Sequence, residues 1–260
     1  MFKRLRIALL LYVLLFVAVA QYFAGQRSKD WDESLWVDVY AVAADHDEST
    51  RRYLDDLEPT EFKDIEPFLA REAERYDLTL AQPFRLRLVG EHRAPLPTLS
   101  QDASMLGVLW WSLRMRWLAT RLRWQADGPS GDVLVFAVFH APSAGVALDS
   151  STALEKGLIA VANVFAARDA RATNQVVLAH ELLHTLGATD KYALATNTPI
   201  FPSGYAAPDA RPLLPQTKAE LMAGRIPIDE RHSEIPRSLR DVVIGPATAM
   251  EIGWKHPGKP

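Results

Sequence analysis

The stretch VLAHELLHTLGATDKY, Val177 to Tyr192, contains a His-Glu-x-x-His motif. His180 and His184 are four residues apart, so in a helix their rings project from the same face, one turn apart. Two zinc–nitrogen bonds of about 2.0–2.1 Å require this geometry. Glu181 can reach a water molecule at the metal without being a ligand, which suits a general base. The stretch therefore predicts a metal site on a helix, with two ordinary polar residues on a helix rim as the alternative.

The flanking residues predict where this helix begins and ends. Thr173 or Asn174 is the expected N-cap, and Gly187 can take a positive φ, which ends the helix and turns the chain back. Asp190 can then face the two histidines and complete a three-ligand zinc site with one open position. The alternative is that Asp190 is a solvent-exposed turn residue beside Lys191.

The stretch HELLHTLGATDKY resembles the extended zinc signature of the metzincin clan of metallopeptidases. Its aspartate, followed by x-Tyr, resembles the snapalysin-like and immune-inhibitor-A-like branches. The resemblance implies that His180, His184 and Asp190 bind Zn²⁺ and that Glu181 is the catalytic base. A carboxylate leaves the metal less positive than a third imidazole would, so bound water should be acidified somewhat less.

The metzincin clan also has a methionine in a tight turn below the metal, followed by a final helix. By the resemblance, Met222 in AELMAGRI would be that methionine, and PATAMEIGW (246–254) would be the closing helix. Tyr192 and Tyr205 could each help to polarise the scissile carbonyl group, and both remain open. If Asp190 does not bind the metal, the first substitute ligand to test is His140, at the end of an expected strand, or a tyrosine.

The composition is that of a globular protein: 48% of the 260 residues are hydrophobic and 23% are charged. The net charge is −3; without Lys3, Arg4 and Arg6 of the N-terminal leader, 26 basic residues face 32 acidic ones. This balance gives no electrostatic reason to expect a nucleic-acid partner. Cysteine is absent, so a metal must take nitrogen and oxygen ligands.

Residues 1–25 are predicted to be a signal anchor or a signal peptide. A positive start, MFKRLR, precedes the apolar run Ile7–Ala20. Extended to residues 7–25, the segment is just long enough to span a membrane as a helix. Its positive N-terminal flank predicts that the rest of the chain lies on the far side of that membrane.

An uncleaved anchor is favoured over a cleaved signal because Tyr22 and Phe23 extend the apolar run with interfacial aromatic residues. Cleavage after Ala20 is the alternative, and it would leave a secreted or periplasmic protein. The excess of arginine over lysine is typical of a GC-rich bacterial genome. We therefore expect a single-pass protein of the bacterial cell membrane with its catalytic domain outside the cytoplasm.

The hydrophobic patterns predict an α/β (α+β) fold with a twisted, mixed, mostly parallel sheet and an active-site helix. Strands are expected at 36–43, 84–92, 132–140 and 157–165. In the helix expected within 60–76, Pro67 causes a kink or marks the beginning. The expected organisation is a leader (1–25), a tether (26–35), an N-terminal β-α segment (36–81) and a metzincin-like catalytic domain (82–260).

The segment Ser104–Trp124 contains four tryptophans and four arginines. It could be a basic amphipathic helix on a membrane surface. We favour a helix packed on the sheet, with arginines extending from its rim, because an all-round apolar helix is usually buried.

Together these features predict an exported zinc-dependent endopeptidase whose partner is a peptide or protein substrate. One alternative is a non-catalytic envelope binding protein that zinc merely stabilises. Another is an interaction domain without a metal.

Overall fold

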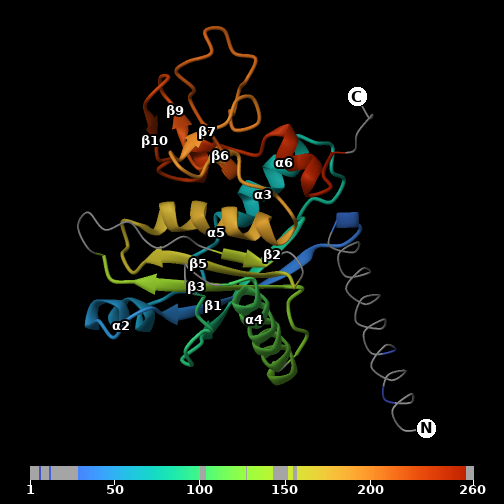
Figure 1. Ribbon diagram of the computed structural model, residues 1–260, viewed down its shortest axis with the longest axis vertical. Helices are drawn as coiled ribbons and strands as arrows, with labels where there is room; N and C mark the ends of the chain where they lie inside the picture. The colour runs from blue at the N-terminus through green and yellow to red at the C-terminus, as the bar shows by residue number, and fades with distance from the viewer. Residues whose placement is uncertain are drawn as a thin grey trace.

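The computed structural model describes residues 6, 12, 29–99, 104–126, 128–142, 152–154 and 157–255. A five-stranded sheet of order β2-β1-β3-β5-β4 lies at its centre (Figure 1). Its strands are β1 (Leu35–Ala43), β2 (Phe84–Glu91), β3 (Val133–His140), β4 (Thr152–Leu154) and β5 (Ile159–Phe165). All neighbours are parallel except β4, which is antiparallel to β5. The predicted mixed, mostly parallel sheet and its four strands are confirmed.

The middle position of β3 explains its sequence. This strand pairs with β1 on one side and β5 on the other, and six of its eight residues are buried. A strand covered on both faces of the sheet reads as a continuous apolar run, here VLVFAVFH.

Helices cover both faces of the sheet. On one face lie α3 (Ile65–Glu74) and α5 (Arg171–Thr185), and α4 (Met105–Gln125) lies on the other (Figure 1). The short helix α2 (Glu48–Asp55) follows β1. Pro67 is the third residue of α3, where its missing N–H has no partner to lose, so it marks the beginning of this helix.

Helix α4 is only partly covered. It contacts the sheet through Trp111, Met115 and Ala119, and this packing is confirmed. The expectation of a largely buried helix is wrong, because the sheet covers only one face of a helix that lies on it. Its outer side exposes Trp110, Trp117 and several leucines to solvent.

The chain after α5 forms short elements above that helix (Figure 1). These are β6 (Tyr192–Ala193), β7 (Thr198–Pro199), β8 (Ala219–Glu220), the 3-10 turn η1 (Leu221–Ala223), β9 (Ile226–Pro227), β10 (Ser233–Glu234), η2 (Leu239–Asp241), β11 (Val242–Val243) and α6 (Pro246–Glu251). A helix is therefore present within the expected closing segment 246–254.

Trp31 joins the two ends of the fold, although it lies in the segment expected to be a tether, 26–35. Its indole Nε1 donates a hydrogen bond of 2.8 Å to the carbonyl oxygen of Ile252, and its ring contacts Phe84 and Trp254. Within residues 29–35, Trp31 and Leu35 therefore contribute to the core.

The membrane segment expected at residues 7–25 lies outside the described residues, apart from Tyr12. Among the residues that are described, no helix is both long and apolar enough to span a bilayer.

Candidate metal centre

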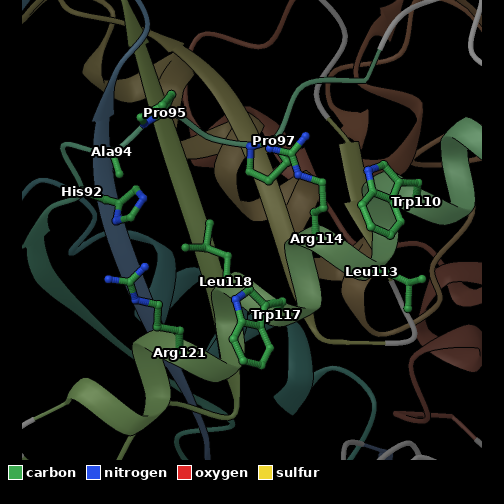
Figure 2. A pocket seen from close by; sticks show the side chains of 10 residues that line it. All are labelled: His92, Ala94, Pro95, Pro97, Trp110, Leu113, Arg114, Trp117, Leu118 and Arg121. Carbon is green, nitrogen blue, oxygen red and sulfur yellow. The ribbon is translucent and has the colours of Figure 1, made fainter.

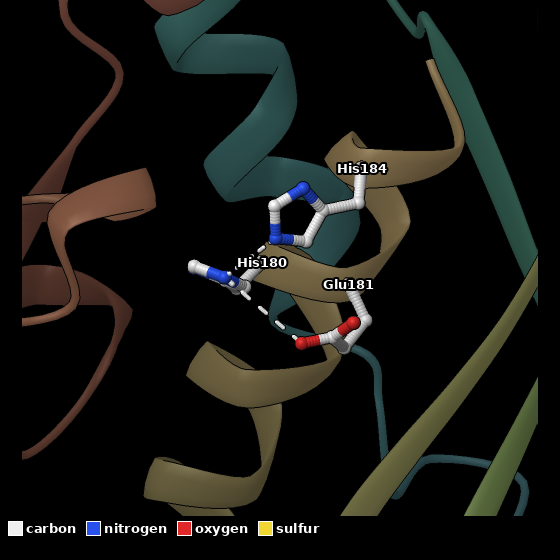
Figure 3. A group of neighbouring side chains, drawn as sticks. All are labelled: His180, Glu181 and His184. Atoms are coloured by element: carbon white, nitrogen blue, oxygen red, sulfur yellow. Dashed lines mark hydrogen bonds and ion pairs between the residues drawn. The ribbon is translucent and has the colours of Figure 1, made fainter. Parts of the chain in front are cut away.

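Helix α5 presents the two histidines of the motif. Nine of its fifteen residues are buried, which fixes the helix between the sheet and the C-terminal segment. Figure 3 shows that His180 and His184 project together from α5, with Glu181 beside them. Their Nε2 atoms are 3.0 Å apart.

The expected N-cap of this helix is wrong. The helix begins at Arg171, with Ala170 as N-cap and no side-chain cap. Asn174 lies inside the first turn, where its side-chain amide accepts a hydrogen bond from the N–H of Phe165 and donates one to its carbonyl oxygen. Thr173 donates its hydroxyl proton to the carbonyl oxygen of Ala170. The Asn174 side chain therefore forms hydrogen bonds with the backbone at the end of β5 instead of capping the start of its own helix.

The helix ends where the sequence predicts. Gly187 has φ of +89°, and its N–H donates to the carbonyl oxygen of His184. The chain turns back and brings Asp190 to the histidines: its Oδ1 atom is 3.2 Å from His180 Nε2 and 3.1 Å from His184 Nε2. The structure thus brings the three expected ligands together.

Backbone carbonyl groups orient both imidazole rings. His180 Nδ1 is 2.9 Å from the carbonyl oxygen of Leu221, and His184 Nδ1 is 2.7 Å from that of Ala188. Because a carbonyl oxygen can only accept, each Nδ1 carries a proton and donates it. In the neutral rings both Nε2 atoms therefore present lone pairs toward Asp190, an arrangement typical of metal-binding histidines.

The three converging atoms fit a zinc ion. A tetrahedral metal with bonds of about 2.1 Å holds its ligand atoms about 3.4 Å apart, close to the separations of 3.0–3.2 Å observed here. Asp190 Oδ1 is buried and has no hydrogen-bond partner among the described residues. Two nitrogen ligands and one oxygen ligand, with no thiolate, also suit zinc.

The electrostatics of the site favour a positive charge. Burial lowers the pKa of His180, but its contact with Asp190 and the charge of Glu181 outweigh burial and raise this pKa. Burial raises the pKa of Asp190, but both histidines outweigh it and hold this pKa well below its usual range. A single proton can be shared by two of the three converging atoms, whereas a metal ion can bind all three.

Glu181 lies next to the ligand atoms but farther from them than Asp190. The Oε1 atom of Glu181 is 3.9 Å from His180 Nε2, and its Oε2 atom has no hydrogen-bond partner among the described residues. Glu181 could also join His180 and His184 in holding a cation, but the shorter distances favour Asp190 as the third ligand. Burial raises the pKa of Glu181, and the two histidines only partly oppose this effect.

The turn that contains Met222 supports His180 from below. Met222 is fully buried in η1, and the preceding Leu221 provides the carbonyl group that accepts from His180. Glu220, which the sequence analysis did not single out, is also fully buried and fixes this turn. Its carboxylate accepts hydrogen bonds from Ala223 N in the turn and from Thr248 Oγ1 in α6.

An ion pair between buried Lys191 and partly exposed Glu251 holds the segment that carries Asp190. Lys191 Nζ lies 2.7 Å from both carboxylate oxygens of Glu251 in α6 and also donates to Thr189. Glu251 in turn accepts from the backbone N–H of Thr189. Sequence reasoning missed this pair, because its members are sixty residues apart and follow no local pattern.

The other candidate residues are placed differently. The Tyr192 side chain interacts with Asp190, whereas the Tyr205 ring packs against Phe201. His140 pairs with Asn163 and lines a separate hollow on the α4 side of the sheet, away from the two motif histidines. Residue 256, a histidine, lies outside the described part of the chain.

Comparisons with known proteins do not assign a family. No family model and no curated protein matches the chain. A solved structure described as a chaperone–substrate complex is 14% identical, with a TM-score of 0.41, over 86% of this chain and 36% of that chain. OgpA from Akkermansia muciniphila is 11% identical, with a TM-score of 0.43, over 90% of this chain and 69% of that one. The chain thus spans about a third of the first structure, and neither likeness bears on function.

Proposed function

We propose that this protein is a zinc-dependent endopeptidase of the metzincin type. The observation that carries the proposal is the convergence of His180 Nε2, His184 Nε2 and Asp190 Oδ1 within 3.0–3.2 Å of one another. The buried Glu181 carboxylate lies beside these atoms.

The geometry of the chain's own groups is compatible with hydrolysis. A zinc ion bound by the three ligands would polarise the scissile carbonyl group and acidify a water molecule. Glu181 is placed to take a proton from that water and return it to the leaving amine. Its raised pKa suits this role, because a stronger base accepts the proton more readily.

Tyr192 is the better placed of the two tyrosines to assist. A tyrosine hydroxyl group ordinarily keeps its proton at neutral pH. Burial and the charges of Asp190 and Glu181 raise the pKa of Tyr192 further. It can therefore donate a hydrogen bond, either to Asp190 or to an oxygen atom of the substrate.

The surrounding frame also supports the proposal. The metzincin resemblance leads one to expect a mixed sheet with the motif helix behind it, a methionine turn and a closing helix. The counterparts here are α5, the buried turn at Met222 and α6. We further propose that residues 7–25 anchor the protein in the bacterial cell membrane with this domain outside the cytoplasm.

Zinc content and cleavage of a broad peptide library, measured together, test the proposal. The full chain in detergent should bind about one zinc ion and cleave peptides. Glu181→Gln keeps the shape of the side chain but removes the proton acceptor. It should retain zinc and lose activity by about 100-fold or more. His184→Ala, the matched control, should lose the metal itself.

Each alternative gives a different result. Stoichiometric zinc without cleavage in the wild-type protein would indicate a zinc-stabilised binding protein. Full stability in a chelator and no bound zinc would indicate a metal-free interaction domain. If Asp190→Ala binds zinc as tightly as the wild type, Asp190 is not a ligand, and Glu181 becomes the first residue to test in its place.

A further inference from the structure

Helix α4 has two apolar faces, and the described residues cover one of them. Trp111, Met115 and Ala119 pack against the sheet. On the opposite side three tryptophans recur every seven residues, or about two helical turns. We call this side the tryptophan face of α4: Trp110, Trp117 and Trp124, which are 64%, 66% and 79% exposed, together with Leu106 and Leu113.

The charge of α4 has a single sign. Residues 104–125 contain four arginines and no aspartate or glutamate. Arg114 and Arg121 border the tryptophan face, are exposed, and form no ion pair with any described residue. Arg123, in contrast, donates a hydrogen bond to the carbonyl oxygen of Asp132. Two positive charges beside the apolar face are thus free to meet an anion.

A groove of about 470 Å³ runs beside this face (Figure 2). Apolar side chains of α4 form one wall, the segment Ala94–Pro97 forms the other, and Arg114 and Arg121 also line it. An apolar wall with two guanidinium groups suits a molecule that has both an apolar chain and an anionic head group.

We propose that the tryptophan face of α4 lies on the surface of a lipid bilayer that contains anionic phospholipids. Tryptophan is favoured at the membrane–water interface, and arginine can hold its charge at the phosphate groups while its stem lies along apolar chains. The apolar segment 7–25 ends shortly before residue 29, where the continuously described part of the chain begins, so its insertion would bring this domain to a bilayer. The proposal does not depend on the metal site.

A second copy of the chain is a poorer occupant of this face. In a two-fold contact, identical patches face each other, so Arg114 and Arg121 would approach the same arginines of the other copy. Helix α4 has no acidic residue to offset that repulsion. The charge of the face therefore favours an anionic surface.

Site-specific labelling of the full chain tests the proposal. The protein has no cysteine, so Leu113→Cys gives one label on the tryptophan face. Leu194→Cys gives a matched label at an exposed position that follows β6, on the far side of the sheet. Each labelled protein is reconstituted into phosphatidylcholine vesicles with or without phosphatidylglycerol. The fluorescence of the label is then measured with an aqueous quencher.

In phosphatidylglycerol vesicles the label at 113 should shift to the blue and resist quenching, and the label at 194 should do neither. Arg114→Gln with Arg121→Gln should lower the ratio of protected to accessible label by about thirtyfold, since each basic residue contributes about fivefold in affinity for an anionic surface. Circular dichroism checks that these variants fold.

Three results would overturn the proposal. Equal quenching at 113 and 194 in anionic vesicles would show that α4 does not contact the bilayer. Protection at 113 that rises with protein concentration in detergent, without vesicles, would assign the face to a second copy. Equal protection in both kinds of vesicle, unchanged by the arginine substitutions, would exclude recognition of anionic lipid.

Discussion

Helix α5 lies between one face of the sheet and the C-terminal segment and buries nine of its fifteen residues, whereas α4, on the other face of the sheet, buries three of its twenty-one. The buried set on α5 includes polar residues with defined partners: Asn174 pairs with Phe165, and Gln175 donates to the carbonyl oxygen of Glu61. The exposed set on α4 is largely apolar. Apolar content alone therefore does not predict burial, because a helix is buried only where another element covers it.

The largest loss of stability is expected when a core side chain is removed from α5. Leu182 is fully buried in the main core, so Leu182→Ala should lower the free energy of unfolding by about 2–5 kcal/mol. Chemical denaturation of the full chain in detergent measures this loss. A cost below about 1 kcal/mol would mean that α5 is not packed as described.

The next effect concerns the support that α6 gives to the segment that carries Asp190. Glu251→Gln leaves the buried ammonium group of Lys191 without its counter-charge and should cost about 1.5–3 kcal/mol, the range for hydrogen bonds to charged groups. Glu230→Gln, at an exposed position, is the matched control.

This effect should depend on pH in a defined direction. Burial raises the pKa of Glu251, but hydrogen bonds from Lys191 and Thr189 outweigh it and lower the pKa. The stabilisation is therefore present above the unfolded pKa, near about 4.3, and is lost as the pH falls through the lower folded value. The free energies of unfolding of the wild type and Glu251→Gln should therefore converge in acid. A difference that stays constant with pH would mean that the loss comes from packing and not from charge.

A smaller effect is expected below the candidate metal centre. Met222 is fully buried but only packs there, so Met222→Leu should cost less than about 1.5 kcal/mol. Zinc content and peptidase activity should change little, which metal analysis and the peptide assay can measure. Complete loss of zinc would mean that Met222 does more than fill space.

The smallest effect should come from the outer side of α4. Leu106 is 76% exposed, so Leu106→Ala should change the free energy of unfolding by no more than about 0.5 kcal/mol in detergent. The same denaturation measurement serves as the check. A cost like that of Leu182→Ala would remove the contrast between the helices and show that this face is covered in solution.

Local sequence patterns predicted much of the fold and of the candidate site. The strand patterns gave the sheet, and the spacing of His180 and His184, with Gly187 as helix terminator, predicted the approach of Asp190. The N-cap at Thr173 or Asn174 was wrong because the Asn174 amide satisfies a strand end instead. Contacts between distant segments, such as Trp31 with Ile252, leave no periodic signal in the sequence. The seven-residue spacing of Trp110, Trp117 and Trp124 marks one side of α4 in the sequence. It does not predict that this side is uncovered, because exposure depends on what the rest of the chain leaves open.

The ion pair between Lys191 and Glu251 has a consequence for the order of synthesis. Both histidines have been added once residue 184 is made, but the partner that fixes the Asp190 segment is added sixty residues after Lys191. A growing chain therefore carries His180 and Glu181 long before α6 can hold Asp190 in place. If the protein is the exported hydrolase proposed here, an unfinished chain lacks a fully supported active centre. Under that proposal, hydrolysis of nearby proteins begins only after α6 has folded into position.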